Sequence, residues 1–226
     1  MSPEGDAAVQ MLMLTLLAVA AADPTPPSSK AAPPLQPGQV RKLFDGKTMA
    51  GWTSANFGGE GDVRVDDGTI VLEMGNNMTG ITWKDATALP TVDYEISLEA
   101  KRVEGDDFFC GLTFPVGDRP CSFIVGGWGG ATVGLSSIDD ADASSNETTT
   151  YHSFDRDRWY RVRVRVTAKT IEAWLDDVRV VNIDYTGRKV SIRSEVDLSR
   201  PLGVSTWLTT AALRNIELKK LPATAK

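Results

Sequence analysis

"WYRVRVRVTAKTIEAWLDDVRVVNID" (residues 159–184) is the stretch that decides the fold class. Its first part alternates apolar residues with arginines: Tyr160, Val162, Val164 and Val166 with Arg161, Arg163 and Arg165. A period of two places these sets on opposite faces of a β-strand. Polar turns at Ala168-Lys169 and Asp176-Asp177 then separate two more apolar runs, over 171–175 and 178–181. The sequence therefore predicts a meander of three antiparallel strands.

The row of arginines on one face of the first strand has two interpretations. It can clamp an acidic or sugar ligand, or it can be the solvated outer face of a half-buried sheet. Alternation along a strand produces such a row without any ligand, so we favour the solvated face.

The rest of the chain after Val40 shows the same period of two. Asp66-Asp67-Gly68 lies between two alternating segments, and Asp-Gly in that position is a strong signal for a tight hairpin. Residues 94–100 alternate apolar with polar side chains, as expected of a strand with one buried face. No helical periodicity of useful length is present. The sequence predicts an all-β domain over residues 39–222, built as a sandwich of two antiparallel sheets.

The first 38 residues differ in composition from the rest. Residues 1–22 contain an apolar run, Met11–Ala22, of the length of a signal-peptide core and too short to span a bilayer, although no Lys or Arg precedes it. Residues 23–38 are proline-rich and typical of a linker. We therefore expect a signal peptide, export to the periplasm, cell surface or medium, no integral membrane segment after cleavage, and a short tail at 223–226.

Overall charge and missing motifs argue against several functions. A formal net charge of −6 disfavours nucleic acid or an anionic membrane as partner, so a neutral or polar partner fits better. His152 is the only histidine, so a histidine-based triad or zinc site would depend on it, and we expect it to be structural. The sequence has no P-loop, dinucleotide-binding or C-x-x-C motif.

The two cysteines, Cys110 and Cys121, are separated by ten residues that include the turn-like "PVGDRP". In an oxidising compartment they can form a disulfide that staples a hairpin. The alternative is two buried thiols on neighbouring strands. We predict the disulfide, which requires the two Cα atoms to lie within about 7 Å.

The side chains left for chemistry are carboxylates and tryptophans, the usual components of carbohydrate sites. Paired carboxylates cleave glycosidic bonds by acid–base catalysis, and tryptophan rings cover the apolar faces of sugars. Most candidates lie in "IVGGWGGATVGLSSIDDADASSNET" (residues 124–148) or in "IRSEVDLS" (residues 192–199). They are Trp128, Asp139, Asp140, Asp142, Glu147, Glu195, Asp197 and, further on, Trp207.

The pattern Asp140-x-Asp142-x-Ser144-x-Asn146 resembles the first half of a calcium loop. The turn glycine and the closing glutamate of such a loop are missing. The segment is therefore either a weak calcium site, with Asp140, Asp142 and Asn146 as ligands, or a solvated loop.

Six segments follow one another in a specific order: "LFDGKTMAGW", "VDDGTIVLE", "DYEISLEAKRVEGDDFFCGLTF", "DRWYRVRVRV", "IEAWLDDVRVV" and "LRNIELKKL". The series runs from about Val40 to Leu221 and resembles the bacterial 3-keto-disaccharide hydrolase family, formerly a domain of unknown function. The resemblance implies a concanavalin A-like jelly-roll sandwich, export, and breakdown of oxidised or ordinary glycosides. The middle of the chain differs from the family pattern, which indicates a divergent branch.

Two functions fit these residues, and in both the partner is a carbohydrate or glycoside. The first is an exported hydrolase of 3-keto-glycosides: the keto group acidifies a neighbouring C–H, a base removes that proton, and the glycosidic oxygen leaves. Its candidate residues are Glu147 or Glu195 as base or acid, Arg193 as oxyanion or substrate clamp, and Trp128, Asp139 and Trp207 as sugar contacts. The alternative is a non-catalytic carbohydrate-binding or laminin-G-like module. Two carboxylates in one pocket, one of them desolvated, would favour the enzyme.

Overall fold

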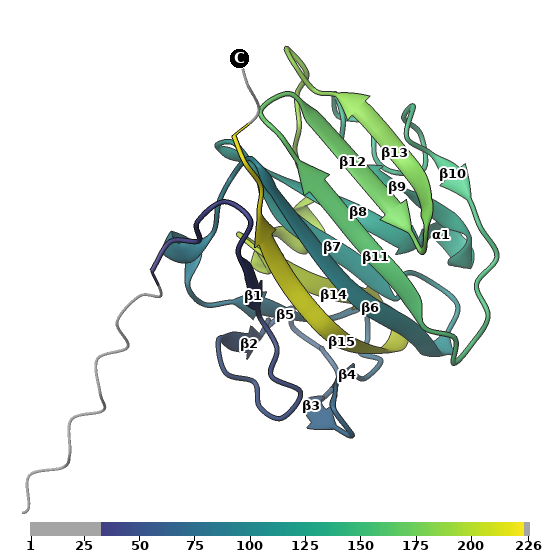
Figure 1. Cartoon of the computed structure of the whole chain (residues 1–226). Helices are drawn as coiled ribbons and strands as arrows, with labels where there is room; N and C mark the ends of the chain where they lie inside the picture. Colours follow the sequence, from purple (N-terminus) through teal and green to yellow (C-terminus); the bar gives the residue numbers. More distant parts are fainter. Residues whose placement is uncertain (1–32, 224–226) are drawn as a thin grey trace, which may run out of the picture. The chain divides into compact units, whose positions relative to one another are not determined.

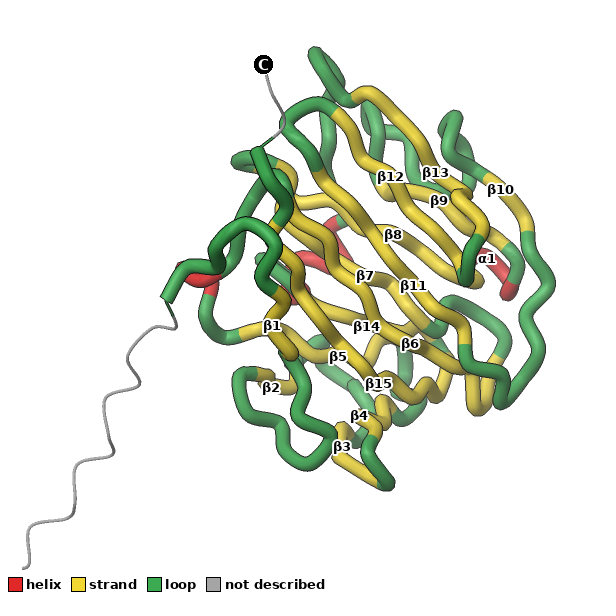
Figure 2. Tube along the Cα trace, viewed as in Figure 1, coloured by secondary structure: helices red, strands yellow, loops and turns green. Residues whose placement is uncertain are grey.

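The computed structural model describes residues 33–223, which form two stacked antiparallel β-sheets (Figure 1). Within this range strands and loops dominate, and helix is limited to three short segments (Figure 2). None of these helices is long and apolar enough to cross a membrane. The predicted signal peptide and most of the predicted linker and tail lie outside the described residues and stay predictions.

The first sheet has eight strands. Its spatial order is β13 (Val178–Asp184), β12 (Thr170–Leu175), β11 (Tyr160–Val166), β6 (Tyr94–Gly105), β15 (Thr209–Lys220), β4 (Thr69–Leu72) and β3 (Val63–Asp66). The remaining strand, β1 (Val40–Lys42), pairs with the end of β15. The last strand of the described chain therefore lies in the middle of this sheet, beside β6 (Figure 1).

The second sheet has seven strands. Its spatial order is β10 (Thr150–Tyr151), β9 (Thr132–Ser136), β8 (Arg119–Gly126), β7 (Cys110–Val116), β14 (Gly203–Trp207), β5 (Met78–Trp83) and β2 (Trp52–Ser54). The helical segments are η1 (Ala86–Ala88), the tight turn α1 (Gly127–Gly130) and η2 (Ser194–Ser199). The all-β, two-sheet jelly-roll architecture predicted from the sequence is confirmed.

The meander and the hairpin predicted from alternating residues are also confirmed. β11 pairs with β12 and β12 with β13, each antiparallel, and β11 lies on its other side against β6. β3 and β4 are joined by Asp67 and Gly68, which both have positive φ, at 42° and 74°. A two-residue turn with φ > 0 at both positions matches the twist of the flanking strands.

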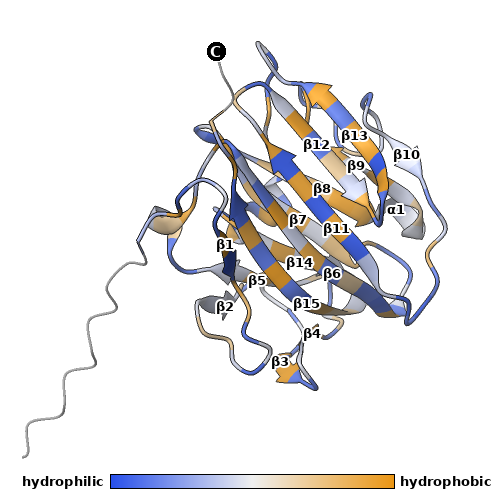
Figure 3. Cartoon of the chain, viewed as in Figure 1, coloured by the Kyte–Doolittle hydropathy of each residue, from blue (hydrophilic) through white to orange (hydrophobic). Residues whose placement is uncertain are grey.

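The core lies between the two sheets. Val162, Val164 and Val166 of β11 are fully buried, as are Phe114 of β7 and Phe123 of β8. Apolar and hydrophilic residues alternate along β11 in Figure 3. This alternation buries one face of each central strand and leaves its other face for solvent or for ligand.

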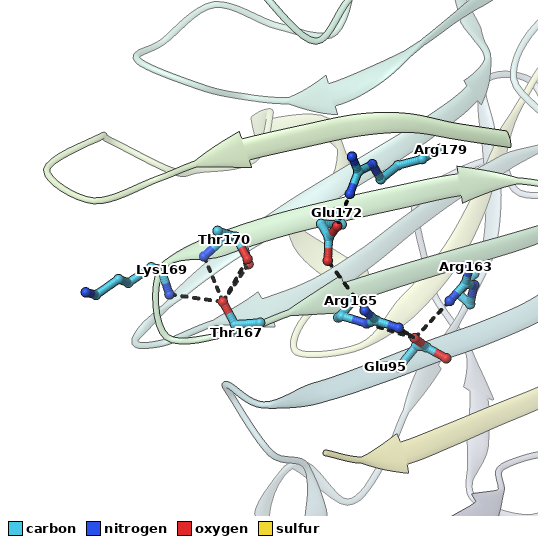
Figure 4. Close-up of polar contacts among 8 residues, drawn as sticks. All are labelled: Glu95, Arg163, Arg165, Thr167, Lys169, Thr170, Glu172 and Arg179. Atoms are coloured by element: carbon cyan, nitrogen blue, oxygen red, sulfur yellow. Dashed lines mark hydrogen bonds and ion pairs between the residues drawn. The ribbon is translucent and has the colours of Figure 1, made fainter. Parts of the chain in front are cut away.

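The outer face of the eight-stranded sheet carries the arginine row, as predicted for a solvated sheet face. Glu95 of β6 accepts hydrogen bonds from both Arg163 and Arg165 (Figure 4). Glu172 of β12 pairs in turn with Arg165 and Arg179. Because each guanidinium in this network already has a carboxylate partner within the sheet, the row is not an open clamp for an acidic ligand.

The outer face of the seven-stranded sheet differs, because loops and η2 cover it. Its small polar side chains Thr113, Ser122 and Ser205 are almost inaccessible to solvent although they point away from the core. η2 approaches β14 so closely that a Cβ on Gly203 would lie 2.5 Å from the Ser199 carbonyl oxygen. A covered sheet face that carries small polar side chains is suited to a binding site.

The predicted disulfide is wrong: Cys110 and Cys121 are free, buried thiols. The hairpin of β7 and β8 does form, but its register places Cys121 opposite Phe114 and Cys110 opposite Val125. The two cysteines are therefore four residues out of register, roughly 13 Å along the strands, which is too far for a disulfide. Burial raises the pKa of each thiol to about 12.

We expect reducing agent to leave the thermal stability of the folded protein unchanged. A disulfide across this hairpin would contribute about 3 kcal/mol, so its reduction would lower the melting temperature by several degrees. Alkylation followed by mass spectrometry should label neither thiol in the native protein and both after unfolding, without added reductant. A non-reduced mass lower by the two hydrogens of a disulfide would contradict this.

Candidate functional site

A pocket of about 200 Å³ opens on the outer face of the seven-stranded sheet. It brings together four of the residues predicted from the sequence, namely Trp128, Arg193, Glu195 and Trp207. Its other lining residues are Met78, Asp107, Phe108, Ser122, Ile124, Ser136 and Val196. They come from segments far apart in the sequence, which meet only because the strands pair as they do.

The floor of the pocket follows from the strand register. Ser122 and Ile124 alternate with the core residues of β8, so both point outward, and Ser136 of β9 lies directly opposite Ser122. At the other side of the floor Trp207 of β14 lies opposite Met78 of β5. The floor thus carries hydroxyls near β9 and apolar side chains near β5.

Gly111 lets an aromatic side chain lie close against this floor. A Cβ at this position would lie 3.1 Å from the Phe108 ring and 3.2 Å from the Ser205 hydroxyl. Phe108 also accepts a hydrogen bond through its carbonyl from the Trp207 backbone N–H, at 3.1 Å. Phe108 is therefore fixed between the sheet and Trp207, as one wall of the pocket.

Trp128 stands at the rim, in the glycine-rich turn α1. Its backbone has φ 48° and ψ 58°, and its side chain is 43% exposed. Gly126, at φ 80°, precedes it, and a Cβ there would lie 2.6 Å from Nη2 of Arg102. The glycines around Trp128 are thus needed for a turn that displays this side chain next to a buried arginine.

Arg102 of β6 holds the two rim segments together. Its side chain is buried, and its Nη2 donates to the carbonyls of Asp107, Gly126 and Gly130 at 3.0, 3.3 and 3.1 Å. Burial lowers the pKa of this guanidinium. One buried cation therefore ties the Asp107 segment to the turn that carries Trp128.

Asp107 adds a second tie and places a carboxylate in the pocket. Its Oδ2 accepts a hydrogen bond from the Gly129 backbone N–H at 3.1 Å, and its Oδ1 accepts one from Phe108 N at 2.7 Å. Two backbone donors orient the carboxylate. Nothing in the sequence distinguishes Asp107 from Asp106, which instead pairs with Arg156.

Glu195 and Arg193 form the polar wall at the start of η2. Arg193 Nη2 donates to Glu195 Oε1 at 2.6 Å, and its Nη1 donates to Asp142 Oδ2 at 2.8 Å. The Ser194 hydroxyl donates to the other oxygen of Glu195 at 3.2 Å. The bond from Arg193 lowers the pKa of Glu195, so this carboxylate is ionised at neutral pH.

Asp139 and Glu147 do not line the pocket, contrary to the sequence prediction. Both pair with Arg188, at 2.5 Å to Asp139 and 2.7 Å to Glu147. The hydrogen bond from Arg188 lowers the pKa of Glu147, and the Lys189 N–H together with Arg188 lowers that of Asp139. These carboxylates fasten the 138–148 loop to the segment after β13.

The side chains of the calcium-like pattern contact other groups of the protein. Asp140 pairs with Lys189, and Asp142 accepts hydrogen bonds from Ser144 and Arg193. The Asn146 amide donates to the carbonyls of Leu135, Ala141 and Asp142, which turns its nitrogen toward the loop interior. Within residues 33–223 no group of three or more His, Cys, Asp or Glu side chains is placed to hold a metal ion.

The two remaining candidates lie outside the pocket lining. His152 is half-buried, with its ring centroid 6.3 Å from that of Phe154. Asp197 pairs with Arg200 at 2.8 Å on the surface of η2. The pocket chemistry of the described residues therefore rests on Asp107, Arg193 and Glu195.

Comparisons with known proteins agree with this architecture. The sequence model of the 3-keto-alpha-glucoside-1,2-lyase-like domain matches residues 39–219. No curated protein sequence matches the chain.

Several solved structures share the fold at low sequence identity. A putative glycosyl hydrolase from Parabacteroides distasonis has a TM-score of 0.51 and 14% identity, and the match covers 82% of this chain and 94% of that one. The Crh5 transglycosylase in complex with NAG has a TM-score of 0.56 and 12% identity, with 87% and 90% covered. A native glycosidic hydrolase has a TM-score of 0.54 and 9% identity, with 84% and 100% covered. At these identities the likeness concerns the fold alone.

Proposed function

Because the chain belongs to the 3-keto-alpha-glucoside-1,2-lyase-like domain family, we propose that it cleaves the glycosidic bond of 3-keto-glycosides in the pocket on its seven-stranded sheet. The observation that carries this proposal is the pairing of Glu195 with Arg193 in one pocket with two tryptophans. A carboxylate base, a cation and aromatic platforms are the parts that such a cleavage needs.

The proposed reaction is an elimination followed by addition of water. Glu195 takes the proton from the carbon between the keto group and the anomeric carbon, which the keto group has acidified. The electron pair of that C–H bond forms a C=C bond to the anomeric carbon as the bond to the glycosidic oxygen breaks. The leaving oxygen then takes the proton from Glu195, and water adds to the unsaturated sugar in a later step.

Arg193 has a defined role in this reaction. Removal of the proton places negative charge on the keto oxygen, and the Arg193 guanidinium, whose side chain is 46% exposed, can stabilise this charge as a hydrogen-bonding cation. Arg193 already donates to Glu195 and Asp142, so its position is fixed before substrate binds. Trp128 and Trp207 would cover the apolar faces of the bound rings.

We place this reaction outside the cytoplasm. The support is the apolar run Met11–Ala22, which has signal-peptide length, followed by a proline-rich linker.

A non-catalytic carbohydrate-binding module is the second candidate function. The observation that favours it is the pKa of Glu195, which is lowered by Arg193, whereas catalytic carboxylates often have a pKa raised by burial. A weak base nevertheless suffices for the proposed elimination, because the keto group acidifies the C–H and Arg193 stabilises the product charge.

Incubation of the purified protein with 3-keto-trehalose, with and without divalent cations, separates the two candidates. We expect release of glucose, with a transient unsaturated sugar that absorbs in the ultraviolet before water adds. Unmodified trehalose serves as the control and should stay intact. Binding of the 3-keto sugar without any cleavage would instead establish the binding module.

A further inference from the structure

The pocket has two chemically different ends. Ser122 and Ser136, of β8 and β9, lie at one end with Arg193 and Glu195, which follow a segment that pairs with Ser137 just after β9. Met78, Phe108, Ile124, Trp128 and Trp207 lie at the other, toward β5 and the turn α1. Ser122 and Ile124 are two residues apart on the same face of β8, so the change occurs over roughly 7 Å.

We propose that the polar end binds the 3-keto sugar ring and that the aromatic end binds a flat, apolar leaving group, so that the substrates are aryl- or arylalkyl-type 3-keto-glycosides rather than disaccharides. This inference rests on the proposed function of the same pocket. It adds the chemical class of the group that departs.

Hydrogen-bonding capacity supports this assignment of the ends. Each hydroxyl of a bound sugar needs a partner to replace the water it loses. The polar end offers the Arg193 guanidinium and the Glu195 carboxylate, which pair with each other but are 46% and 41% exposed, whereas the buried Ser122 hydroxyl is already hydrogen-bonded to Thr113. At the aromatic end the sole charged side chain is Asp107, and both its oxygens already accept backbone hydrogen bonds.

A second sugar ring at the aromatic end would therefore bury several hydroxyls against apolar side chains, without hydrogen-bond partners. A flat apolar ring would instead stack on tryptophan and phenylalanine without that loss. The exposed side chains at this end continue the apolar surface to the rim: Trp128 and Leu208, which follows Trp207, are both 43% exposed.

The size of the pocket limits the leaving group. At about 200 Å³ the pocket is smaller than the ≈ 300–1,000 Å³ typical of sites for drug-sized ligands. It accommodates one sugar ring and part of a second ring. The leaving group is therefore a single flat ring that extends to Trp128 at the rim, not an oligosaccharide.

The test compares two 3-keto-glucosides that share the sugar and differ in the leaving group: the benzyl glucoside and 3-keto-trehalose. Neither releases a phenol, and 3-keto-trehalose releases the more acidic hemiacetal hydroxyl, so a higher kcat/KM for the benzyl compound reports binding rather than leaving-group acidity. We expect the benzyl compound to have at least a tenfold higher kcat/KM, mostly through a lower KM. An equal kcat/KM, or a higher one for the disaccharide, would overturn the inference.

Variants test whether the aromatic end causes this preference. Trp128→Ala should raise KM for the benzyl compound about tenfold and KM for the disaccharide by a clearly smaller factor. The exposed Trp128 ring is lost without a core cavity, so the fold stays intact. Tyr151→Ala is the matched control, since Tyr151 is a 69% exposed aromatic outside the pocket lining. A parallel loss for both substrates in Trp128→Ala would contradict the assignment.

Binding measurements keep this inference separate from the proposed function. Calorimetric titration of both 3-keto compounds measures the preference even where neither is cleaved. Tighter binding of the benzyl compound without turnover would support the two-ended pocket and refute the elimination. Cleavage of both compounds with equal affinity would support the elimination and refute the two-ended pocket.

Discussion

Replacement of Glu195 by glutamine should lower kcat on a 3-keto-glucoside about a thousandfold, in line with the 10²–10⁴ contribution of a positioned general base. Glutamine keeps the shape of the side chain and an oxygen that can accept the hydrogen bond from Arg193, but it cannot take a proton from carbon. KM should change little, because the pocket walls stay in place. Steady-state kinetics on 3-keto-trehalose measures both parameters.

Two matched variants serve as controls for Glu195→Gln. Asp197→Asn removes a carboxylate from the same helix, η2, that pairs with Arg200 outside the pocket lining. Glu147→Gln removes the other glutamate proposed from the sequence, which pairs with Arg188. Both should keep activity within about twofold of the unmodified protein, because surface substitutions away from a site have small effects. More than a tenth of the activity left in Glu195→Gln would refute the assignment of the base.

The pH profile provides an independent check on Glu195. The ionised carboxylate is the active form, and the hydrogen bond from Arg193 lowers its pKa. The acid limb of kcat/KM should therefore lie below about pH 4.3, the ordinary pKa of a glutamate. Removal of that bond in Arg193→Met should move the limb to higher pH as well as reduce the rate. An acid limb unchanged in position would show that another group sets it.

The period of two along the chain was sufficient to predict the fold, and particular residues show why. Val162, Val164 and Val166 are predicted to share a buried face, and they do so because strand geometry depends only on the local alternation. The turn at Asp67 and Gly68 is equally local, since Asp-Gly adopts the positive φ angles that a two-residue hairpin requires.

The prediction of the disulfide was wrong because the distance between the cysteines depends on the register of β7 and β8, not on the alternation of residues. Sequence placed both cysteines on adjacent antiparallel strands, which is correct. Their distance, however, is set by where the turn falls, and the turn after Val116 leaves Cys110 and Cys121 four residues out of register. A shift of the turn by two residues would have brought the two cysteines opposite each other. The sequence does not distinguish these two positions of the turn.

The site was predicted only in part, because it too depends on which segments the fold brings together. Trp128, Trp207, Arg193 and Glu195 were selected by residue chemistry, and the pairing of strands does bring them into one pocket. Asp139 and Glu147 have the same chemistry, but they pair with Arg188, which is 49 positions from Asp139 and is placed only by the folded sheet. Asp107 was not predicted because its carboxylate is oriented by the backbone N–H groups of Phe108 and Gly129, and such contacts depend on the fold.

Replacement of Arg102 by methionine should lower the free energy of unfolding by about 3 kcal/mol, since one buried and two partly buried carbonyl groups lose their donor. For a domain of this size the melting temperature should fall by about 10 °C. Methionine fills a similar volume, so the loss reports the hydrogen bonds and the charge rather than a cavity. Chemical denaturation and thermal unfolding measure the two quantities.

The neighbouring residue provides the control for Arg102. Lys101 points outward, with its ammonium 5.2 Å from the centre of the Trp159 ring, so Lys101→Met should change stability by less than about 0.5 kcal/mol. Arg102→Lys should fall between the two, because the ammonium keeps the charge but, on a shorter side chain, does not reach the position from which Nη2 donates to three carbonyls.

The function of Arg102 should be visible apart from its effect on stability. Arg102 fixes the turn that displays Trp128, so at a temperature where Arg102→Met is fully folded its KM should rise while kcat changes less. Faster hydrogen exchange at the amides of Gly129 and Gly130 should accompany that rise, because the turn loses its anchor to β6. Unchanged exchange at these amides, with the stability loss intact, would show that Asp107 alone holds the turn and that Arg102 acts only on the core.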